Sequence, residues 1–162
     1  TYYEIIRKKT AVLFATCAQL GAMASGASAA DTERFRLFGE KVGICFQIKD
    51  DIFDYYESPE LGKPTGNDML EGKLTLPAIY AVNTSADDHI RDLVKRVKSG
   101  HVTHDEIVEL IRFTKAHGGI EYAMQAMEKL RREALDLILP VQDDDIRTSL
   151  EAFLSYVVER TK

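Results

Sequence analysis

The sequence predicts an all-α protein, folded as an antiparallel bundle of helices. Three observations support this prediction. Alanine and leucine are the commonest residues, glutamate and lysine are also frequent, and the chain has only 4 prolines; this composition favours helix. Apolar residues recur at helical spacing along most of the chain. Capping residues and breakers separate the periodic segments, and β-branched runs are few, so no strand is predicted.

The first predicted helix covers about residues 1–23, and a stretch rich in Gly, Ala and Ser ends it. Asp31 is the expected N-cap of a long second helix, about residues 32–56, with an apolar stripe along one face. A segment rich in Pro and Gly follows at residues 57–73, and so many breakers exclude a continuous helix there. Helix resumes near Leu76, with a proline in its first turn.

Cap signals predict four further helices. Ser85 with Asp88 resembles a capping box at the start of one helix, and Thr103 with Glu106 resembles one at the start of the next, which Gly118 ends. A third helix runs from about Ile120 to Leu139 and stops at Pro140. Asp143 caps the last helix, which runs to about Arg160.

The chain of 162 residues suits a single domain, residues 1–162, with a real core. Its net charge is −5 and it has no basic stripe, which argues against nucleic-acid binding. No signal peptide and no membrane span are expected, because the sequence shows neither the pattern of a signal peptide nor an apolar run of sufficient length. Cys17 and Cys45 lie within apolar helical patterns, so both are expected to be buried, reduced thiols of a cytoplasmic protein. Helical periodicity is already present at Tyr2 without a preceding cap, so an N-terminal part is expected to be missing.

Asp50, Asp51 and Asp54 form an acidic cluster near the end of the second predicted helix. Their spacing places all three carboxylates on one helix face, where like charges repel. The C-terminal end of a helix also disfavours anions, because the helix dipole is negative there. A cation that offsets both costs is therefore expected, and ligands that offer only oxygen favour Mg²⁺.

A solvated acidic face is the alternative interpretation, because an isolated Asp-Asp-x-x-Asp is a weak motif. Two other acidic groups provide a contrast: Asp87 with Asp88, and residues 143–145. Both lie at predicted helix N-termini, where acids cap the helix and complement its dipole. Only the cluster at residues 50–54 lies where helix electrostatics oppose it.

Several other residues suggest a phosphorylated substrate beside this cluster. Lys63 and Lys73 follow it in the breaker-rich segment, and Lys9, next to Thr10, lies among apolar residues of the first helix. Lysine binds phosphate as a mobile point charge, although each lysine taken singly is better explained as a solvated surface residue. Gly39, Gly43 and Gln47 share the helical strip of the acidic cluster. The two glycines would let a neighbouring helix or a long ligand approach the backbone.

In their order and spacing, these segments resemble the second half of the polyprenyl synthetases, the trans-type isoprenyl diphosphate synthases. The resemblance is carried by Lys9-Thr10 on a helix and by three later stretches: residues 46–54 (Phe-Gln-Ile-Lys-Asp-Asp-Ile-Phe-Asp), 62–68 (Gly-Lys-Pro-Thr-Gly-Asn-Asp) and 71–77 (Glu-Gly-Lys-Leu-Thr-Leu-Pro). It covers about residues 1–82, and further along it rests on helical character alone.

This resemblance implies the C-terminal part of the isoprenoid synthase fold and a Mg²⁺-dependent condensation of an allylic diphosphate with isopentenyl diphosphate. Asp50 would be a direct metal ligand, and Asp51 and Asp54 would act directly or through water. Lys9, Lys63 and Lys73 would bind the diphosphate.

The resemblance further implies that Thr10 and Gln47 lie beside the developing allylic cation and that Asp68 supports the site from behind. A homodimer is expected, as is usual in the family. The family's first aspartate-rich motif and its isopentenyl diphosphate-binding arginines are absent from the sequence, so this chain alone is expected to be inactive.

Three alternatives stay open at this point. A terpene cyclase shares the fold and an Asp-Asp-x-x-Asp, but Lys9-Thr10, Gly62-Lys63 and the position of the acidic motif argue against it. A non-catalytic partner subunit of a synthase would not need the metal and diphosphate residues. A structural helical bundle with a fortuitous acidic face would show no dependence on Mg²⁺.

Overall fold

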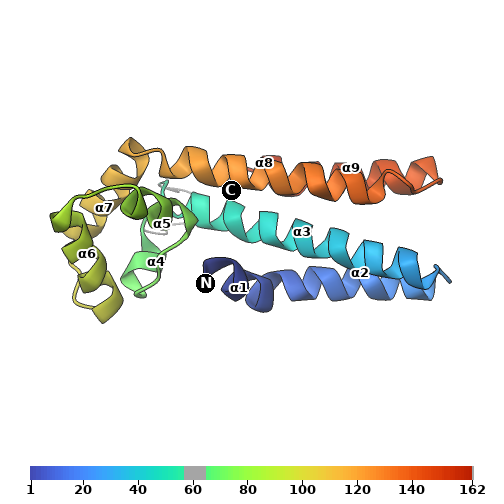
Figure 1. Cartoon of the computed structure of the whole chain (residues 1–162), viewed down its shortest axis with the longest axis horizontal. Helices are drawn as coiled ribbons and strands as arrows, with labels where there is room; N and C mark the ends of the chain where they lie inside the picture. The colour runs from blue at the N-terminus through green and yellow to red at the C-terminus, as the bar shows by residue number, and fades with distance from the viewer. Residues whose placement is uncertain (57–64, 162) are drawn as a thin grey trace. The chain divides into compact units, whose positions relative to one another are not determined.

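The computed structural model describes residues 1–56 and 65–161, and all regular structure in these ranges is helical (Figure 1). The predicted all-α class is therefore confirmed. The elements follow in this order: α1 (Tyr2–Ile6), the π-helical segment η1 (Arg7–Ala11), α2 (Val12–Ala24), α3 (Ala29–Phe53), α4 (Asn67–Leu70), α5 (Leu76–Asn83), α6 (Asp88–Ser99), α7 (His104–Ala116), α8 (Gly119–Ile138) and α9 (Asp144–Glu159).

Two of the predicted helix caps are confirmed. Thr103 and Glu106 form a complete capping box at the start of α7, because each side chain accepts a hydrogen bond from the other residue's backbone N–H. Asp143 caps α9 by accepting from the N–H groups of Asp145 and Ile146. These caps satisfy amide groups that a helix cannot pair internally, and so the two helices begin where the sequence predicts.

Two other caps differ from the prediction. Ser28, rather than Asp31, caps the start of α3: its Oγ accepts from the Asp31 N–H at 3.1 Å and donates to the Asp31 carboxylate at 2.8 Å. Asp87, rather than Ser85, caps α6, and the Ser85 hydroxyl instead accepts from the Asp87 N–H at 3.1 Å. In both cases two neighbouring side chains can each cap the helix, and the spacing of the sequence predicted the wrong residue of the pair.

Contacts within the chain divide the described residues into two compact units. The first comprises residues 1–49 and 126–161, and the second comprises residues 50–125. The single domain expected from the sequence stays a prediction.

Helix α3 organises the first unit, because α2, α8 and the end of α9 all contact it. Lys41 forms an ion pair with Glu133 of α8, with Nζ 2.5 Å from the carboxylate. The Arg160 guanidinium, just after α9, donates to the Phe46 carbonyl at 3.1 Å. The core between these helices consists of fully or nearly fully buried residues: Phe38, Val42, Cys45, Ile48, Ala134, Ile138, Leu154 and Val157.

Helices α2 and α3 run side by side (Figure 1), and two glycines allow their backbones to approach closely. A Cβ atom on Gly39 would lie 2.5 Å from the carbonyl oxygen of Phe14, and one on Gly43 would lie 2.6 Å from the Cα of Ala11. Both distances are too short for any side chain. The expectation that these glycines admit a neighbouring helix is confirmed.

The second unit packs α5 against α7 and carries the turn that follows α3. Its buried core consists of Tyr55, Met69, Leu76, Ala78, Ala81, Ile90, Leu93, Val97, Ile107, Leu110, Ile120 and Ala123. Tyr80 and Tyr122 stack with ring centroids 4.0 Å apart. Gly119 begins α8 directly over Pro77, since a Cβ there would lie 2.5 Å from the Pro77 carbonyl oxygen.

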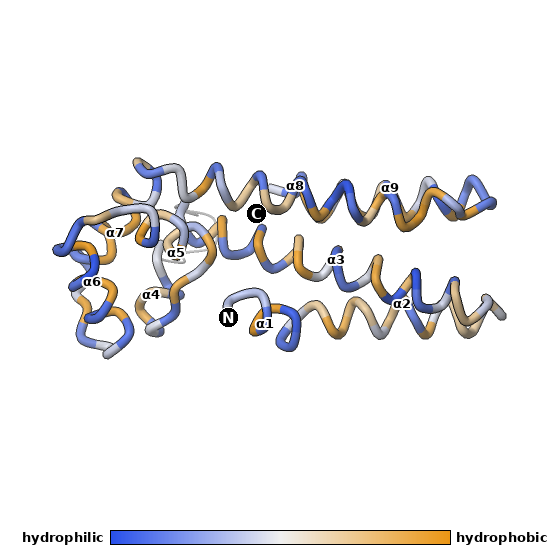
Figure 2. Tube along the Cα trace, viewed as in Figure 1, coloured by the Kyte–Doolittle hydropathy of each residue, from blue (hydrophilic) through white to orange (hydrophobic). Residues whose placement is uncertain are grey.

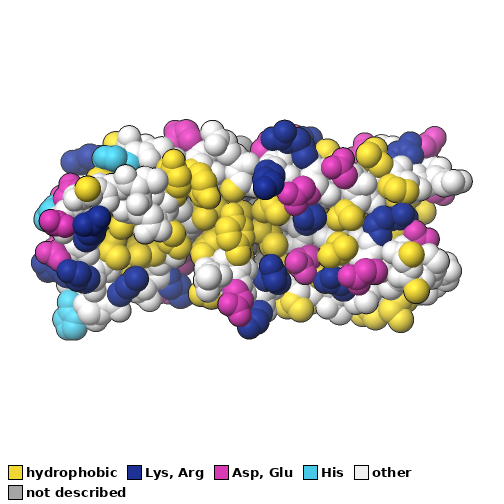
Figure 3. Space-filling model, viewed as in Figure 1, with side chains coloured by type: hydrophobic (Ala, Val, Ile, Leu, Met, Phe, Trp, Pro, Cys, Tyr) yellow, Lys and Arg dark blue, Asp and Glu magenta, His cyan; other side chains and the backbone are white. Residues whose placement is uncertain are grey.

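The surface combines mixed charge with an apolar stripe. Acidic and basic side chains are interspersed on the face seen in Figure 3. Hydrophobic residues recur along α2 in Figure 2. The stripe on α1 and α2 comprises the exposed residues Ile5, Val12, Leu13, Leu20 and Met23, and Leu13 is 66% exposed. Within the described residues, no helix has both the length and the apolar content that a bilayer crossing requires.

The two cysteines differ in a way that the sequence did not predict. Cys45 is buried as expected, and its thiol lies 3.6 Å from the Met127 carbonyl oxygen. Cys17 is exposed on α2, so the prediction that both thiols are buried is wrong for this residue. The apolar stripe of α1 and α2 is itself exposed, and an apolar neighbourhood in sequence therefore did not indicate burial.

We expect Gly39→Ala and Gly43→Ala to lower the free energy of unfolding by about 1–3 kcal/mol each, because the added methyl group overpacks the α2–α3 contact. Gly21→Ala is the matched control: no atom lies within 4 Å of the position that its Cβ would take, and it should be neutral or stabilise by up to about 1 kcal/mol through helix propensity. Urea unfolding followed by circular dichroism measures all three. Equal effects at the three sites would contradict the close approach.

We also expect only one thiol per native chain to react readily with a maleimide near pH 8. Burial raises the pKa of Cys45 to about 12, and the thiolate is the reactive form. Cys17→Ser should abolish the fast reaction, whereas Cys45→Ser should leave it unchanged. Mass spectrometry of the labelled chain distinguishes the two sites, and rapid labelling of Cys45 in the folded chain would contradict its burial.

Candidate functional site

Lys9 and Thr10 lie in the π-helical segment η1, between α1 and α2. A π-helical turn holds more residues than an α-helical turn, so it changes which side chains face a neighbouring helix, and such turns are frequent at functional sites. The sequence predicted one uninterrupted helix here, and nothing in its apolar periodicity indicated the change. The π-turn is therefore a feature that sequence reasoning missed.

Thr10 and Gln47 are brought together across the packing of η1 and α2 on α3. The Thr10 hydroxyl donates to the Gln47 side-chain oxygen at 2.7 Å, between residues 37 positions apart. Thr10 directly precedes Ala11, and Gln47 lies one helical turn after Gly43, so the pair is next to the close contact between Ala11 and Gly43. The two predicted catalytic residues thus meet where a glycine lets their helices approach.

Lys9 differs from its two basic neighbours in its ion pairs. Arg7 Nε lies 3.4 Å from the Glu40 carboxylate, and Lys8 Nζ lies 2.8 Å from the Glu4 carboxylate. Lys9 is exposed and makes no ion pair with any other residue in the described ranges. Its ammonium group can therefore contact an external anion.

Asp50, Asp51 and Asp54 lie at the C-terminal end of α3, as predicted, but their environments differ. Asp51 is only 4% exposed, whereas Asp50 and Asp54 are half-buried. A buried carboxylate is costly unless polar or cationic groups compensate it. The cluster is therefore not a fully solvated acidic face, and this alternative interpretation is weakened.

Asp54 has specific partners in the segment that follows the helix. One carboxylate oxygen accepts from the Asn67 N–H at 3.0 Å, and the other accepts from the Asp68 N–H at 3.1 Å. The Asp54 backbone carbonyl also accepts from the Gly66 N–H at 2.9 Å. Asp54 therefore binds the start of the short helix α4, an element that the sequence did not predict.

Lys73 lies just beyond α4, where its backbone N–H donates to the Asp68 carbonyl at 2.8 Å. Its ammonium group pairs with the Glu71 carboxylate. That hydrogen bond, together with the charges of Glu71 and Asp68, raises the pKa of Lys73 above its ordinary value. The Lys73 side chain is 54% exposed, and an exposed pair of this kind contributes little stability, so the ammonium can exchange Glu71 for another anion. Lys63 lies outside the described residues.

Tyr55 is a structural residue of this region that the sequence reasoning did not single out. Its hydroxyl shares a hydrogen bond of 3.2 Å with the Thr75 hydroxyl, and both residues are buried. Burial raises the pKa of Tyr55, so its hydroxyl stays protonated and the hydrogen bond persists. The pair joins the end of α3 to the start of α5. Tyr55 continues the helical spacing of the buried Ile52, and this spacing is the sequence pattern that could have indicated its burial.

The chemistry of the acidic residues fits Mg²⁺ bound together with a phosphorylated substrate. Among the residues that the structure describes, no three His, Cys, Asp or Glu side chains gather as a metal site. Protein-bound Mg²⁺ often uses only one or two carboxylates and takes its remaining oxygens from phosphate and water. Asp50, Asp51 and Asp54 each offer carboxylate oxygens for such a set, and each Asp54 oxygen also accepts one backbone N–H.

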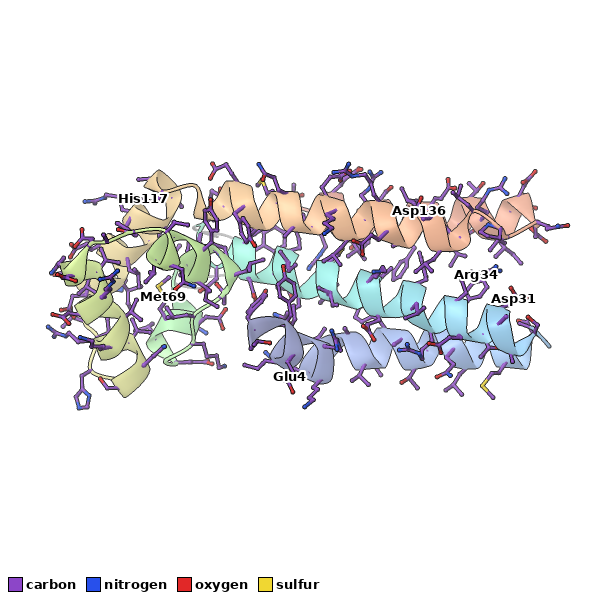
Figure 4. The ribbon with its side chains drawn as sticks, viewed as in Figure 1. Glu4, Asp31, Arg34, Met69, His117 and Asp136 are labelled. Atoms are coloured by element: carbon purple, nitrogen blue, oxygen red, sulfur yellow. The ribbon has the colours of Figure 1, made fainter. Side chains whose placement is uncertain are left out.

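A cavity of 710 Å³ opens elsewhere in the first unit, between the end of α2, the start of α3 and the α8–α9 connection. Asp31 and Arg34 line it, and Figure 4 shows them near each other at the start of α3, where Arg34 Nη2 lies 2.5 Å from the Asp31 carboxylate. None of the described residues that were predicted for catalysis, diphosphate binding or metal binding lines this cavity.

Comparison with known proteins places the predicted motifs in a defined family. The family model described as "Polyprenyl synthetase" matches residues 1–113, a range that contains every predicted site residue. The heptaprenyl diphosphate synthase component 2 of Bacillus subtilis is 35% identical over 99% of this chain and 45% of its own length. The short chain isoprenyl diphosphate synthase of Methanothermobacter thermautotrophicus is 33% identical over 98% of this chain and 49% of its own length.

Solved structures agree with the sequence comparison. The crystal structure of geranylgeranyl pyrophosphate synthase from Bacteroides thetaiotaomicron matches with a TM-score of 0.93 and 53% identity, over 98% of this chain and 52% of that one. A decaprenyl diphosphate synthase from Rhodobacter capsulatus matches with a TM-score of 0.88 and 34% identity, over 99% of this chain and 50% of that one. The chain thus spans about half the length of the relatives that it matches, and it belongs to the polyprenyl synthetase family.

Proposed function

We propose that this chain is the C-terminal part of a Mg²⁺-dependent prenyltransferase that condenses an allylic diphosphate with isopentenyl diphosphate. The observation that carries the proposal is the hydrogen bond between Thr10 and Gln47, two residues from separate motifs within the family-matched range. The chemistry of Asp50 and Asp51, and the charge of Lys9 without an ion pair among the described residues, support it.

In this proposal the basic residues bind the diphosphate and stabilise it as a leaving group. Lys9 and Lys73 each offer an ammonium group to the diphosphate oxygens, and Lys63 is proposed to do the same. Charge develops on the leaving pyrophosphate as the carbon–oxygen bond breaks, and fixed cations stabilise that charge more than the ground state. Mg²⁺ held by Asp50, with Asp51 and Asp54 acting directly or through water, would supply further neutralisation of the same charge.

Thr10 and Gln47 are proposed to stabilise the allylic cation that remains. Because the Thr10 hydroxyl donates its hydrogen to Gln47, the lone pairs of the Thr10 oxygen can face a positive centre. The double bond of isopentenyl diphosphate attacks this cation, and loss of a proton completes the product. Because Gln47 already orients the Thr10 hydroxyl, this dipole needs no reorganisation at the moment of reaction.

We further propose that the chain by itself does not turn over substrate and that it functions in the cytoplasm as a homodimer. The lack of turnover follows from the missing first aspartate-rich motif, since a half-site would hold only part of the metal cluster. The exposed apolar residues Val12, Leu13, Leu20 and Met23 favour self-association.

A second candidate is a non-catalytic partner subunit of a prenyl diphosphate synthase. The relatives from Bacillus subtilis and Geobacillus stearothermophilus are both named component 2 of a heptaprenyl diphosphate synthase, which favours an assembly of different chains. A partner that never binds diphosphate has no use for Asp50 or Lys9, so their substitution distinguishes the two candidates.

We expect titration calorimetry with farnesyl diphosphate to show binding that requires Mg²⁺ and that Asp50→Ala abolishes. Asp144→Ala is the matched control, because Asp144 belongs to another acidic group, is exposed, and lies at a helix N-terminus. It should bind as the parent chain does. Binding that survives in Asp50→Ala, or that needs no Mg²⁺, would contradict the assignment of Asp50.

We expect Lys9→Gln to weaken diphosphate binding about tenfold, because a charge-assisted hydrogen bond contributes about 1.5–3 kcal/mol and tenfold corresponds to about 1.4 kcal/mol. Lys8→Gln makes the same chemical change at the preceding residue, where the ammonium pairs with Glu4, and it should change affinity little. The same titration measures both variants, and equal effects would show that only the net charge of this segment matters.

A further inference from the structure

We propose that Asp54 is a positioning residue: its carboxylate fixes the segment 66–73 and thereby sets the position of Lys73. The link to Lys73 rests on the function proposed above, whereas the anchoring of the segment does not.

Each oxygen of the Asp54 carboxylate accepts one backbone hydrogen bond. These oxygens accept from two consecutive amides, those of Asn67 and Asp68, at 3.0 and 3.1 Å. The two amides belong to the first turn of α4, where no carbonyl within the helix can pair with them. Hydrogen bonds from N–H groups to an ionised carboxylate are stronger than those to a neutral acceptor, so the carboxylate holds the start of α4 firmly.

The same two hydrogen bonds offset the electrostatic cost of an acid at the end of α3. The helix dipole disfavours a carboxylate there, and a bound cation is one way to offset that cost. For Asp54 the two amide dipoles of α4 provide the compensation within the chain. The location of this carboxylate is therefore explained without direct contact to a metal ion.

The anchored segment is also held at other points. The Gly66 N–H donates to the Asp54 carbonyl at 2.9 Å. Gly66 has φ +76°, and a Cβ there would lie 2.4 Å from the Ile107 side chain, so only glycine fits against α7. Met69, labelled in Figure 4, is 2% exposed and attaches α4 to the core of the second unit.

Asp68 connects Asp54 to Lys73 through its backbone. It donates its N–H to the Asp54 carboxylate, and its carbonyl accepts the N–H of Lys73 at 2.8 Å. A single residue thus joins the two. Gly72, with φ +76°, makes the intervening turn, and its N–H donates to the Met69 carbonyl at 3.0 Å. Loss of the Asp54 carboxylate would remove this hydrogen bond to the Asp68 N–H and loosen the backbone that leads to Lys73.

Amide hydrogen exchange measured by NMR on the whole chain tests the anchor. In Asp54→Ala the amides of Asn67 and Asp68 should exchange about tenfold faster or more, as expected for loss of a bond to a charged acceptor. Asp50→Ala, at an acid one turn earlier on α3, should leave them unchanged. The amides of the buried residues Val97 and Leu110 report whether each variant is folded. If Asp54→Ala does not fold, the conservative variant Asp54→Asn replaces it in the same measurement.

Two results would overturn the anchor: unchanged exchange of both amides in a folded Asp54 variant, or a rise of their exchange to the variant's level when Mg²⁺ is added to the parent chain. The second would mean that the carboxylate leaves the amides to bind metal directly. If Asp54 is an anchor, Mg²⁺ leaves the protection of both amides unchanged.

A double-mutant cycle on the binding of inorganic pyrophosphate with Mg²⁺ tests the positioning of Lys73. If Asp54 acts through Lys73, then Lys73→Gln should weaken binding less in an Asp54→Asn background than in the parent chain. Equal losses in both backgrounds would overturn this role, because a merely structural effect is additive. A parent chain that binds no pyrophosphate contradicts the proposed function, while the exchange experiment still decides the anchor.

Discussion

The close approach of α2 to α3 is the constraint on which the first unit depends. Gly43 lies against Ala11 so tightly that a methyl group has no room, and the Thr10 hydroxyl comes within 2.7 Å of Gln47 beside this contact. Glycine costs helix propensity at both Gly39 and Gly43. The close packing of the two backbones, at the density of a protein interior, offsets part of this loss of stability. A larger residue would separate the two motifs that meet there.

Electrostatics at helix ends organise the acidic residues of the chain. Asp143 and Asp87 cap the helices that they precede, where the dipole favours a carboxylate. Asp54 lies at the unfavourable end of α3, yet it meets the favourable end of α4. This contact orders a breaker-rich segment together with the close fit of Gly66. An ordered segment can present Lys73 at a defined place. Because such a segment loses little conformational entropy when an anion binds, its order favours affinity.

The all-α class, the approximate helix bounds and the family were available from the sequence, because each depends on local patterns. Periodicity, capping residues and motif order need no knowledge of what lies opposite. The Thr103 capping box and the Asp143 cap were predicted for this reason, and the motifs around Lys9 and Asp50 identified the family. The burial of Cys17 was predicted wrongly, since periodicity indicates an apolar face without indicating whether anything covers it.

Only the tertiary structure decided which partners the functional residues have. The π-turn at Lys9, the bond from Thr10 to Gln47, and the two amides on Asp54 all arise between segments that are distant along the chain or irregular. The sequence by itself determined the helices and the kinds of chemical group present. The packing of those helices decided which groups meet, because contact between side chains depends on distances across helices that no local pattern contains.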